Sequence, residues 1–301
     1  MSNKLALFML FAVSPAMAVS EPETAVVEEV VIKETADAPV VAESQPVSPV
    51  APNNNLRKVD SKNDTTLQNV VDAFPSGWLL GVGMVYSPTN FIDQNDDSSL
   101  IPIPAVMYFG ERFFLLGTEA TYTIARGKQF SFVANAKYRF SALDPEADSI
   151  LSTLDPRDGQ LEVGVGVNAL TKIGFINTKV SADVSGRSEG YLADIAWNFP
   201  YYKKGLLLIP SLGVTWYDSK MSNYYYGGVS QAESNIFVPA YDTGSVYSLN
   251  ASLIAGYRFS PQWMAIGGFS YSNFSSGMAD SPVMKNDYQA NVFASLGYFW
   301  D

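Results

Sequence analysis

The 301-residue chain has no cysteine and no histidine. Without histidine it has no imidazole base for a serine hydrolase and no imidazole metal ligand. Without cysteine it has neither a thiolate nucleophile nor a disulfide. A formal charge of −11 argues against nucleic acid as a partner. We therefore predict a protein that is not an enzyme, binds no metal and carries no cofactor.

Residues 1–18 have the three parts of a secretory signal peptide. Lys4 supplies the positive charge, Leu5 to Val13 form a short apolar run, and Ala16 and Ala18 supply the small residues of a cleavage site. A membrane-spanning helix needs about 20 apolar residues, and no run in this chain reaches that length. We predict cleavage after Ala18 and export of the mature chain.

Residues 19–76 are rich in Glu, Val, Ala and Pro and poor in aromatic residues, as in "PVVAESQPVSPVAPNNN". Such a segment cannot bury enough apolar area to offset the entropy of ordering it. We predict a disordered acidic tail. The stretch from Glu23 to Ile32 faintly resembles a TonB-binding box, and an acidic solvated linker is the preferred interpretation.

From residue 77 to residue 301 apolar and polar residues alternate in long runs, as in "FSFVANAKYRF" at residues 130–140. Alternation places the two kinds of side chain on opposite faces of a strand. A soluble sandwich would also alternate, but these runs are about ten residues long, aromatic residues gather at their ends and charges lie in their middles. These features favour an all-β fold, a transmembrane antiparallel β-barrel with an apolar exterior.

The alternating runs give eleven strands, near residues 78–87, 101–109, 112–124, 128–140, 161–171, 174–184, 190–199, 205–217, 246–259, 262–273 and 288–300. Bacterial single-chain barrels have an even number of strands. We therefore prefer twelve, with a strand missed around Tyr224 to Ser230; the fallback is ten, with one strand wrongly split into two runs. The connections at 141–160 and 218–245 are predicted to be extracellular.

The polar faces of these strands carry the predicted lumen charges, whereas Val180 is predicted to face lipid. The charges either line a narrow pore or pair with one another inside a filled barrel. They are Lys137, Arg139, Glu162, Lys179, Asp183, Asp194 and Arg258.

The stretch "DQNDDSS" at residues 93–99 imitates the beginning of a calcium loop. Ser98 stands where such a loop requires glycine, and Pro104 stands where it requires a bidentate glutamate. We interpret it as a solvated surface loop.

Two segments resemble the MipA/OmpV family of outer-membrane proteins: "PSLGVTWYDSKMSNYYYGGVSQAES" at 210–234 and "ADSPVM" at 279–284. "LDPRDGQLEVGVG", before the strand at 161–171, is a weaker match. The chain departs from the family pattern by having Gly227 and Gly228 where one glycine is usual.

The resemblance implies a location in the Gram-negative outer membrane, in contact with its lipid, and a role as a scaffold that links a lytic transglycosylase to a murein synthase. It leaves two alternatives open, a small porin and a surface adhesin or antigen. An adhesin would act through exposed Tyr224, Tyr225 and Tyr226. The acidic tail lies outside the resemblance. Two roles are equally compatible with the tail: it reaches periplasmic murein enzymes, or it serves as a translocation spacer.

Overall fold

The computed structural model describes residues 76–93 and 100–300. Ala18 with the predicted signal peptide, the predicted tail up to residue 75 and the calcium-like stretch from residue 94 to residue 99 lie outside the described residues. The expectations for those segments remain predictions.

Thirteen strands and two short helices make up the described part of the chain. In chain order they are β1 (Gly77–Tyr86), β2 (Leu100–Phe109), β3 (Phe113–Leu116), β4 (Glu119–Arg126), β5 (Phe130–Arg139), β6 (Gln160–Thr171), β7 (Gly174–Asp183), β8 (Tyr191–Asn198), β9 (Tyr201–Lys203), β10 (Leu206–Tyr217), α2 (Ser219–Tyr225), β11 (Val246–Arg258), β12 (Trp263–Phe274), α3 (Ser276–Ala279) and β13 (Tyr288–Trp300). In this part of the chain no helix is long and apolar enough to cross a membrane.

The strands form a closed antiparallel barrel, because β1 pairs with β13 and each further strand pairs with its neighbour around the ring. β8 and the three-residue β9 both pair with β10, one after the other along its length, so the wall has twelve positions. The prediction of a transmembrane β-barrel with twelve strands is confirmed.

The missing twelfth strand is not where the sequence suggested. The run predicted at 112–124 is two strands, β3 and β4, joined by a turn in which Gly117 has a φ of +54°. Tyr224 and Tyr225 belong to α2, so the expectation of a strand around Tyr224 to Ser230 is wrong.

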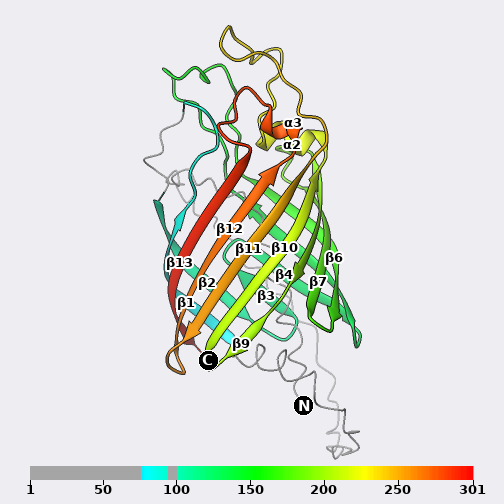
Figure 1. Ribbon diagram of the computed structural model, residues 1–301, viewed down its shortest axis with the longest axis vertical. Helices are drawn as coiled ribbons and strands as arrows, with labels where there is room; N and C mark the ends of the chain where they lie inside the picture. Colours follow the sequence, from blue (N-terminus) through cyan, green and yellow to red (C-terminus); the bar gives the residue numbers. More distant parts are fainter. Residues whose placement is uncertain (1–75, 94–99, 301) are drawn as a thin grey trace, which may run out of the picture.

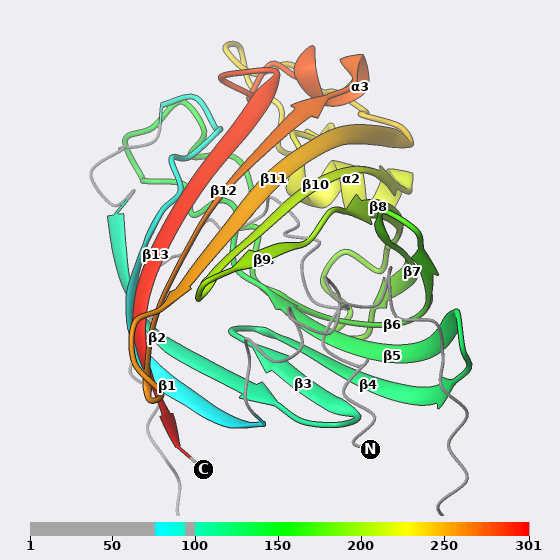
Figure 2. The same cartoon turned by 60° about the horizontal axis from the view of Figure 1, so that its bottom comes forward.

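The two ends of the barrel differ (Figures 1 and 2). At one end, here called the turn end, β1 begins, β13 finishes and short turns join the strands. At the other, here called the loop end, lie α2, α3 and the long connections at 140–159 and 218–245. Outer-membrane barrels have short periplasmic turns and longer extracellular loops, so the turn end faces the periplasm. The two longest connections share the loop end, as predicted.

The outer face of the wall is apolar. Along β5 and β6 the residues predicted to face lipid are exposed or half-buried, and the alternate residues are mostly buried in the lumen. Exposed aromatic side chains form two girdles. Near the turn end these are Trp78, Phe113, Phe130, Tyr257, Trp263 and Trp300; near the loop end they are Tyr86, Tyr138, Tyr191, Trp216, Tyr247 and Tyr288.

The sequence suggested a polar lumen, but only part of the lumen is polar. Near the turn end a buried apolar cluster lines it, contributed by strands β1 to β3, β7 and β10 to β13: Leu79, Met107, Phe109, Phe114, Phe175, Leu207, Ile209, Ile254, Met264, Ile266 and Phe299. Near the loop end a second cluster joins the strand ends to α2 and α3, with Leu192, Tyr217, Met221, Tyr225, Tyr226, Val246, Phe274 and Met278. Polar side chains occupy the level between the two clusters.

Candidate functional site

A belt of charged side chains lies in the lumen between the two apolar clusters. Strand register sets Lys137 between Glu119 and Glu162 on three consecutive strands. The guanidinium of Arg139 donates to Glu162, and Lys179 Nζ lies 3.0 Å from Glu119 Oε1. Buried ion pairs of this kind fill space and compensate charge, so this arrangement is that of a filled lumen rather than of a charged pore.

The other three predicted lumen charges lie apart from this belt or at its edge. Asp194 accepts a hydrogen bond from Thr215 Oγ1 at 2.8 Å within the lumen. Asp183 lies at the loop end and accepts from the backbone N–H groups of the turn at 185–189. Arg258 lies at the turn end, where it donates to the carbonyls of Ser260 and Pro261.

Three segments that resemble the family lie far apart in the sequence but meet at the loop end. Arg157 of "LDPRDG" donates to the carbonyl of Gly228 at 3.2 Å. Tyr225 Oη of "YYYGGV" donates to the carbonyl of Asp158 at 2.8 Å, and Ser281 Oγ of "ADSPVM" donates to the carbonyl of Gly227 at 2.6 Å. These three segments form a structure that we call the cap.

Steric constraints explain why both consecutive residues of the cap, 227 and 228, are glycine. Gly227 has a φ of +98°, and a Cβ on it would lie 2.3 Å from Ser281 Oγ. A Cβ on Gly228 would lie 2.5 Å from the Cα of Asn223 in α2. The departure from the family pattern therefore allows close packing of α2 against the other cap segments.

The three consecutive tyrosines are not an exposed surface. Tyr225 and Tyr226 are only 2% and 5% exposed, and Tyr224 is half-buried. Arg139 Nη1 donates to Tyr226 Oη at 3.2 Å, and that hydroxyl donates to Tyr217 Oη at 3.3 Å. The expectation that all three tyrosines are exposed is wrong for two of them, because they join the cap to the lumen wall.

An open cleft of about 570 Å³ lies on the outer side of the cap. Most of its charges are paired: Arg157 with Glu233 at 2.6 Å, Lys220 with Glu189 at 2.9 Å, and Arg187 with Asp158 at 2.9 Å. Asp242 instead accepts hydrogen bonds from Asn223 and Gly244. No group of three or more Asp or Glu that could hold a metal is found in residues 76–93 and 100–300. The cleft is suited to a polar surface contact, and it offers no metal ligand set.

Glu233 fixes the long loop at 218–245. Its carboxylate accepts from the N–H groups of Ser230 and Asp155 at 2.8 and 3.1 Å and pairs with Arg157. Burial alone would raise the pKa of this carboxyl, but these hydrogen bonds and the charge of Arg157 outweigh it, and its pKa lies below the ordinary value.

This shift predicts acid loosening of the loop. A carboxyl whose pKa is lowered by folding stabilises the fold above its unfolded pKa, about 4.3 for glutamate, and this stabilisation is lost as the pH falls through the lower folded value. We expect hydrogen-exchange protection of the Ser230 and Asp155 amides, corrected for intrinsic rates, to fall on acidification. Glu233→Gln should lower that protection already at neutral pH. Glu189→Gln, on an exposed ion pair, should change it little; an equal effect of both variants would contradict the assignment.

Several residues that matter here were missed at the level of sequence. Glu119 lies in the run at 112–124, which the alternation pattern predicts to be one strand. Dividing this run at Gly117 places the side chain of Glu119 on the lumen face, beside Lys137. The Arg157–Glu233 pair joins residues 76 positions apart, and nothing local in the sequence signals it.

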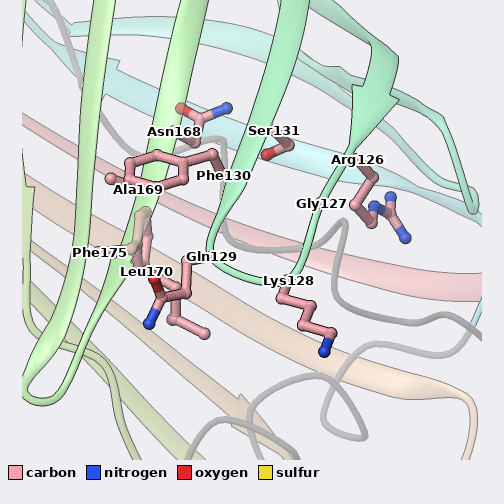
Figure 3. Close-up of a pocket in the computed structure, with 10 residues that line it drawn as sticks. All are labelled: Arg126, Gly127, Lys128, Gln129, Phe130, Ser131, Asn168, Ala169, Leu170 and Phe175. Atoms are coloured by element: carbon pink, nitrogen blue, oxygen red, sulfur yellow. The ribbon is translucent and has the colours of Figure 1, made fainter.

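The turn end is basic. The described turns and strand ends there carry one acidic residue, Glu111, and seven basic residues, which are Arg112, Arg126, Lys128, Lys172, Lys203, Lys204 and Arg258. Figure 3 shows Arg126 and Lys128 beside a small cavity of about 30 Å³ under the β4–β5 turn. The described loops at the other end have the opposite balance, with twelve acidic and four basic residues.

A closed antiparallel barrel with an apolar exterior, two aromatic girdles and short turns at one end defines an outer-membrane β-barrel protein. The chain belongs to the MipA family: the family model described as MltA-interacting protein MipA matches residues 80–300. The printed names of the family and of the relatives below are those of an interacting protein and of outer-membrane proteins, not of enzymes.

The MltA-interacting protein of Escherichia coli (strain K12) is 25% identical to this chain over 221 residues, covering 72% of this chain and 87% of that protein. The outer membrane protein OmpV of Vibrio cholerae is 24% identical over 158 residues, covering 52% of this chain and 61% of OmpV. Among solved structures, the NanC porin matches with a TM-score of 0.39 and 10% identity, covering 73% of this chain and all of the porin.

Proposed function

We propose that this protein is a non-enzymatic scaffold that holds murein-remodelling enzymes, a lytic transglycosylase and a murein synthase, at the outer membrane. The observation that carries this proposal is the turn end, a basic surface facing the periplasm on a barrel whose lumen charges are paired. The name of the Escherichia coli relative, MltA-interacting protein, supports the same class of partner.

A basic surface of this kind favours acidic partners, since complementary charge speeds encounter and fixes orientation. The seven basic residues and one acidic residue give the turn end a formal charge of +6. The twelve acidic and four basic residues of the loop end give −8. A periplasmic partner with an acidic face fits the first surface and is repelled by the second.

A surface adhesin is the second candidate, and one observation favours it. Ile236 and Phe237, at the tip of the loop at 218–245, are 91% and 66% exposed. Large apolar side chains at an exposed loop tip are typical of contact sites. If the adhesin role holds, these two residues replace the tyrosines as the contact surface.

The scaffold is tested by cross-linking in native envelopes from a photoreactive residue at Gln129 in the β4–β5 turn. We expect murein enzymes among the adducts. Replacing Lys128, Lys172, Lys203 and Lys204 together with glutamine should reduce their recovery several-fold, whereas Lys220→Gln at the loop end should not. Deleting residues 21–55 separates a contribution of the tail from that of the turns. Recovery of host-surface ligands through the loop tip, with no murein enzyme at the turn end, would favour the adhesin instead.

A further inference from the structure

The barrel wall has a notch beside β2. β3 has only four residues and pairs with β2 at Met107 to Phe109. The next contact is from the Gly117 N–H to the Val106 carbonyl, at 3.0 Å. In the part of the chain that the structure describes, no strand pairs with Leu100 to Ala105 on the side away from β1. We call this free edge, above the β3–β4 hairpin, the notch.

The notch lies at membrane depth, in the half nearer the loop end. Its lower part is level with Val82, which pairs with Pro104 and is 72% exposed on the lipid face. Its upper part is level with Tyr86 of the loop-end girdle, which pairs with Leu100. The free edge therefore borders the hydrocarbon of the extracellular leaflet.

Two prolines adapt this edge to lipid. In an antiparallel strand alternate residues direct their N–H and C=O groups to the same side, and Val106 directs its carbonyl to the hairpin. Residues 104, 102 and 100 therefore face the notch. The two at greater membrane depth, 104 and 102, are proline, which has no N–H, whereas Leu100 keeps its N–H at the level of the loop-end girdle. The two donors that hydrocarbon would leave without a partner are absent. The same prolines oppose the addition of a strand from another protein.

The lumen side of the notch is apolar and incompletely covered. Ile101 and Ile103 lie on the lumen face of β2, because they alternate with the lipid-facing prolines, and both are half-buried. On the adjacent strand, Ile101 pairs with the buried Val85 and Ile103 pairs with Gly83, which has no side chain to cover it. A cavity of about 50 Å³ lies within the cap between the segments that follow β1 and β5, with Phe91 and Phe140 among its lining residues.

We propose that the notch is a lateral entrance through which an acyl chain of an extracellular-leaflet lipid reaches Ile101 and Ile103 inside the wall. Its depth, its apolar lumen side and the missing N–H donors all match a hydrocarbon chain. The missing N–H donors do not match an added β-strand. This lipid contact is separate from the scaffold role and does not depend on it.

Site-directed spin labelling tests the entrance, since the absence of native cysteine makes any introduced cysteine unique. A nitroxide at Ile103→Cys should be relaxed strongly by oxygen, which partitions into lipid, and weakly by a water-soluble nickel complex. Val180→Cys, on the lipid face, should behave in the same way. Val133→Cys, buried on the lumen face of the complete wall, should be shielded from both reagents. A label at residue 103 that behaves like the one at residue 133, or that is open to nickel, would overturn the proposal.

A second measurement needs no substitution. The unmodified protein in phosphatidylcholine vesicles that contain a diazirine-bearing acyl chain should, on illumination, form adducts at Ile101 or Ile103. Leu79 and Val85, the buried lumen-facing residues of β1, should form at least several-fold fewer. Labelling of lipid-facing residues alone would show that no acyl chain enters, and equal labelling of all four residues would show that a chain enters the lumen without a preference for the notch; either result would overturn the proposal.

Discussion

Arg139→Met should be among the most destabilising single substitutions in this protein. The side chain of Arg139 is fully buried, and it holds Glu162 on one side and the Tyr226 hydroxyl of the cap on the other. The substitution leaves a buried carboxylate without its partner, which typically costs about 3 to 5 kcal/mol. The measurement is the free energy of unfolding in detergent micelles, from the denaturant midpoint.

Two controls show whether the pair carries the effect. Arg139→Met combined with Glu162→Met removes both charges, and buried pairs replaced in this way often lose little stability, so the double variant should recover much of the loss. Arg187→Met breaks the exposed pair with Asp158, about half exposed on each side, and should cost about 1 kcal/mol or less. A double variant as unstable as the single one would mean that packing of Arg139, not its charge, matters.

Val180→Arg should be the second large effect, because it puts a charge at mid-depth on the lipid face. Val180 is 54% exposed and lies between the levels of Ile176, which pairs with Trp197, and Ala182, which pairs with Tyr191. Arginine near the membrane midplane of a barrel costs about 2 to 4 kcal/mol. The expected result is a lower temperature at which the folded form, seen as an unboiled band on a denaturing gel, disappears.

Ile173→Arg is the matched control. Ile173 lies in the turn before β7 and is 64% exposed at the turn end, where arginine costs about 0 to 1 kcal/mol. Equal destabilisation at the two positions would mean that the lipid level has been misplaced along β7. Tolerance at both would mean that the exposed face of this strand does not meet lipid.

Much of the fold was predictable, because lipid outside and side chains inside impose a period of two on each strand. β5 shows this most clearly, since the lipid-facing Phe130 and Tyr138 alternate with the buried lumen residues Ser131, Lys137 and Arg139. The β3–β4 hairpin escaped because its turn in "FFLLGTEATYTI" is only Gly117 and Thr118, and Gly117 alone marks the reversal. The apolar cluster in the lumen escaped for a related reason: in "LLLI" of β10 both faces are apolar, so alternation carries no signal.

The candidate site was less predictable than the fold because long-range contacts create it. The motifs at 154–159, 224–229 and 279–284 each indicated the family, yet nothing in them says that they meet. Tyr226 is buried in a cluster with Phe274, and Arg139, 87 residues away, donates to its hydroxyl. The notch depends on the length of β3, which is set by a hairpin that the alternation pattern did not resolve.

Single-channel recording in planar bilayers tests the central claim most directly, namely that this barrel acts through its surfaces and not as a pore. With the Arg139–Glu162 and Lys179–Glu119 pairs in the belt, an apolar cluster at the turn end and the cap at the loop end, the purified full-length protein should show no stable open level. Large, long-lived, ion-selective steps whose selectivity changes with Lys179→Glu would contradict the account and establish a porin.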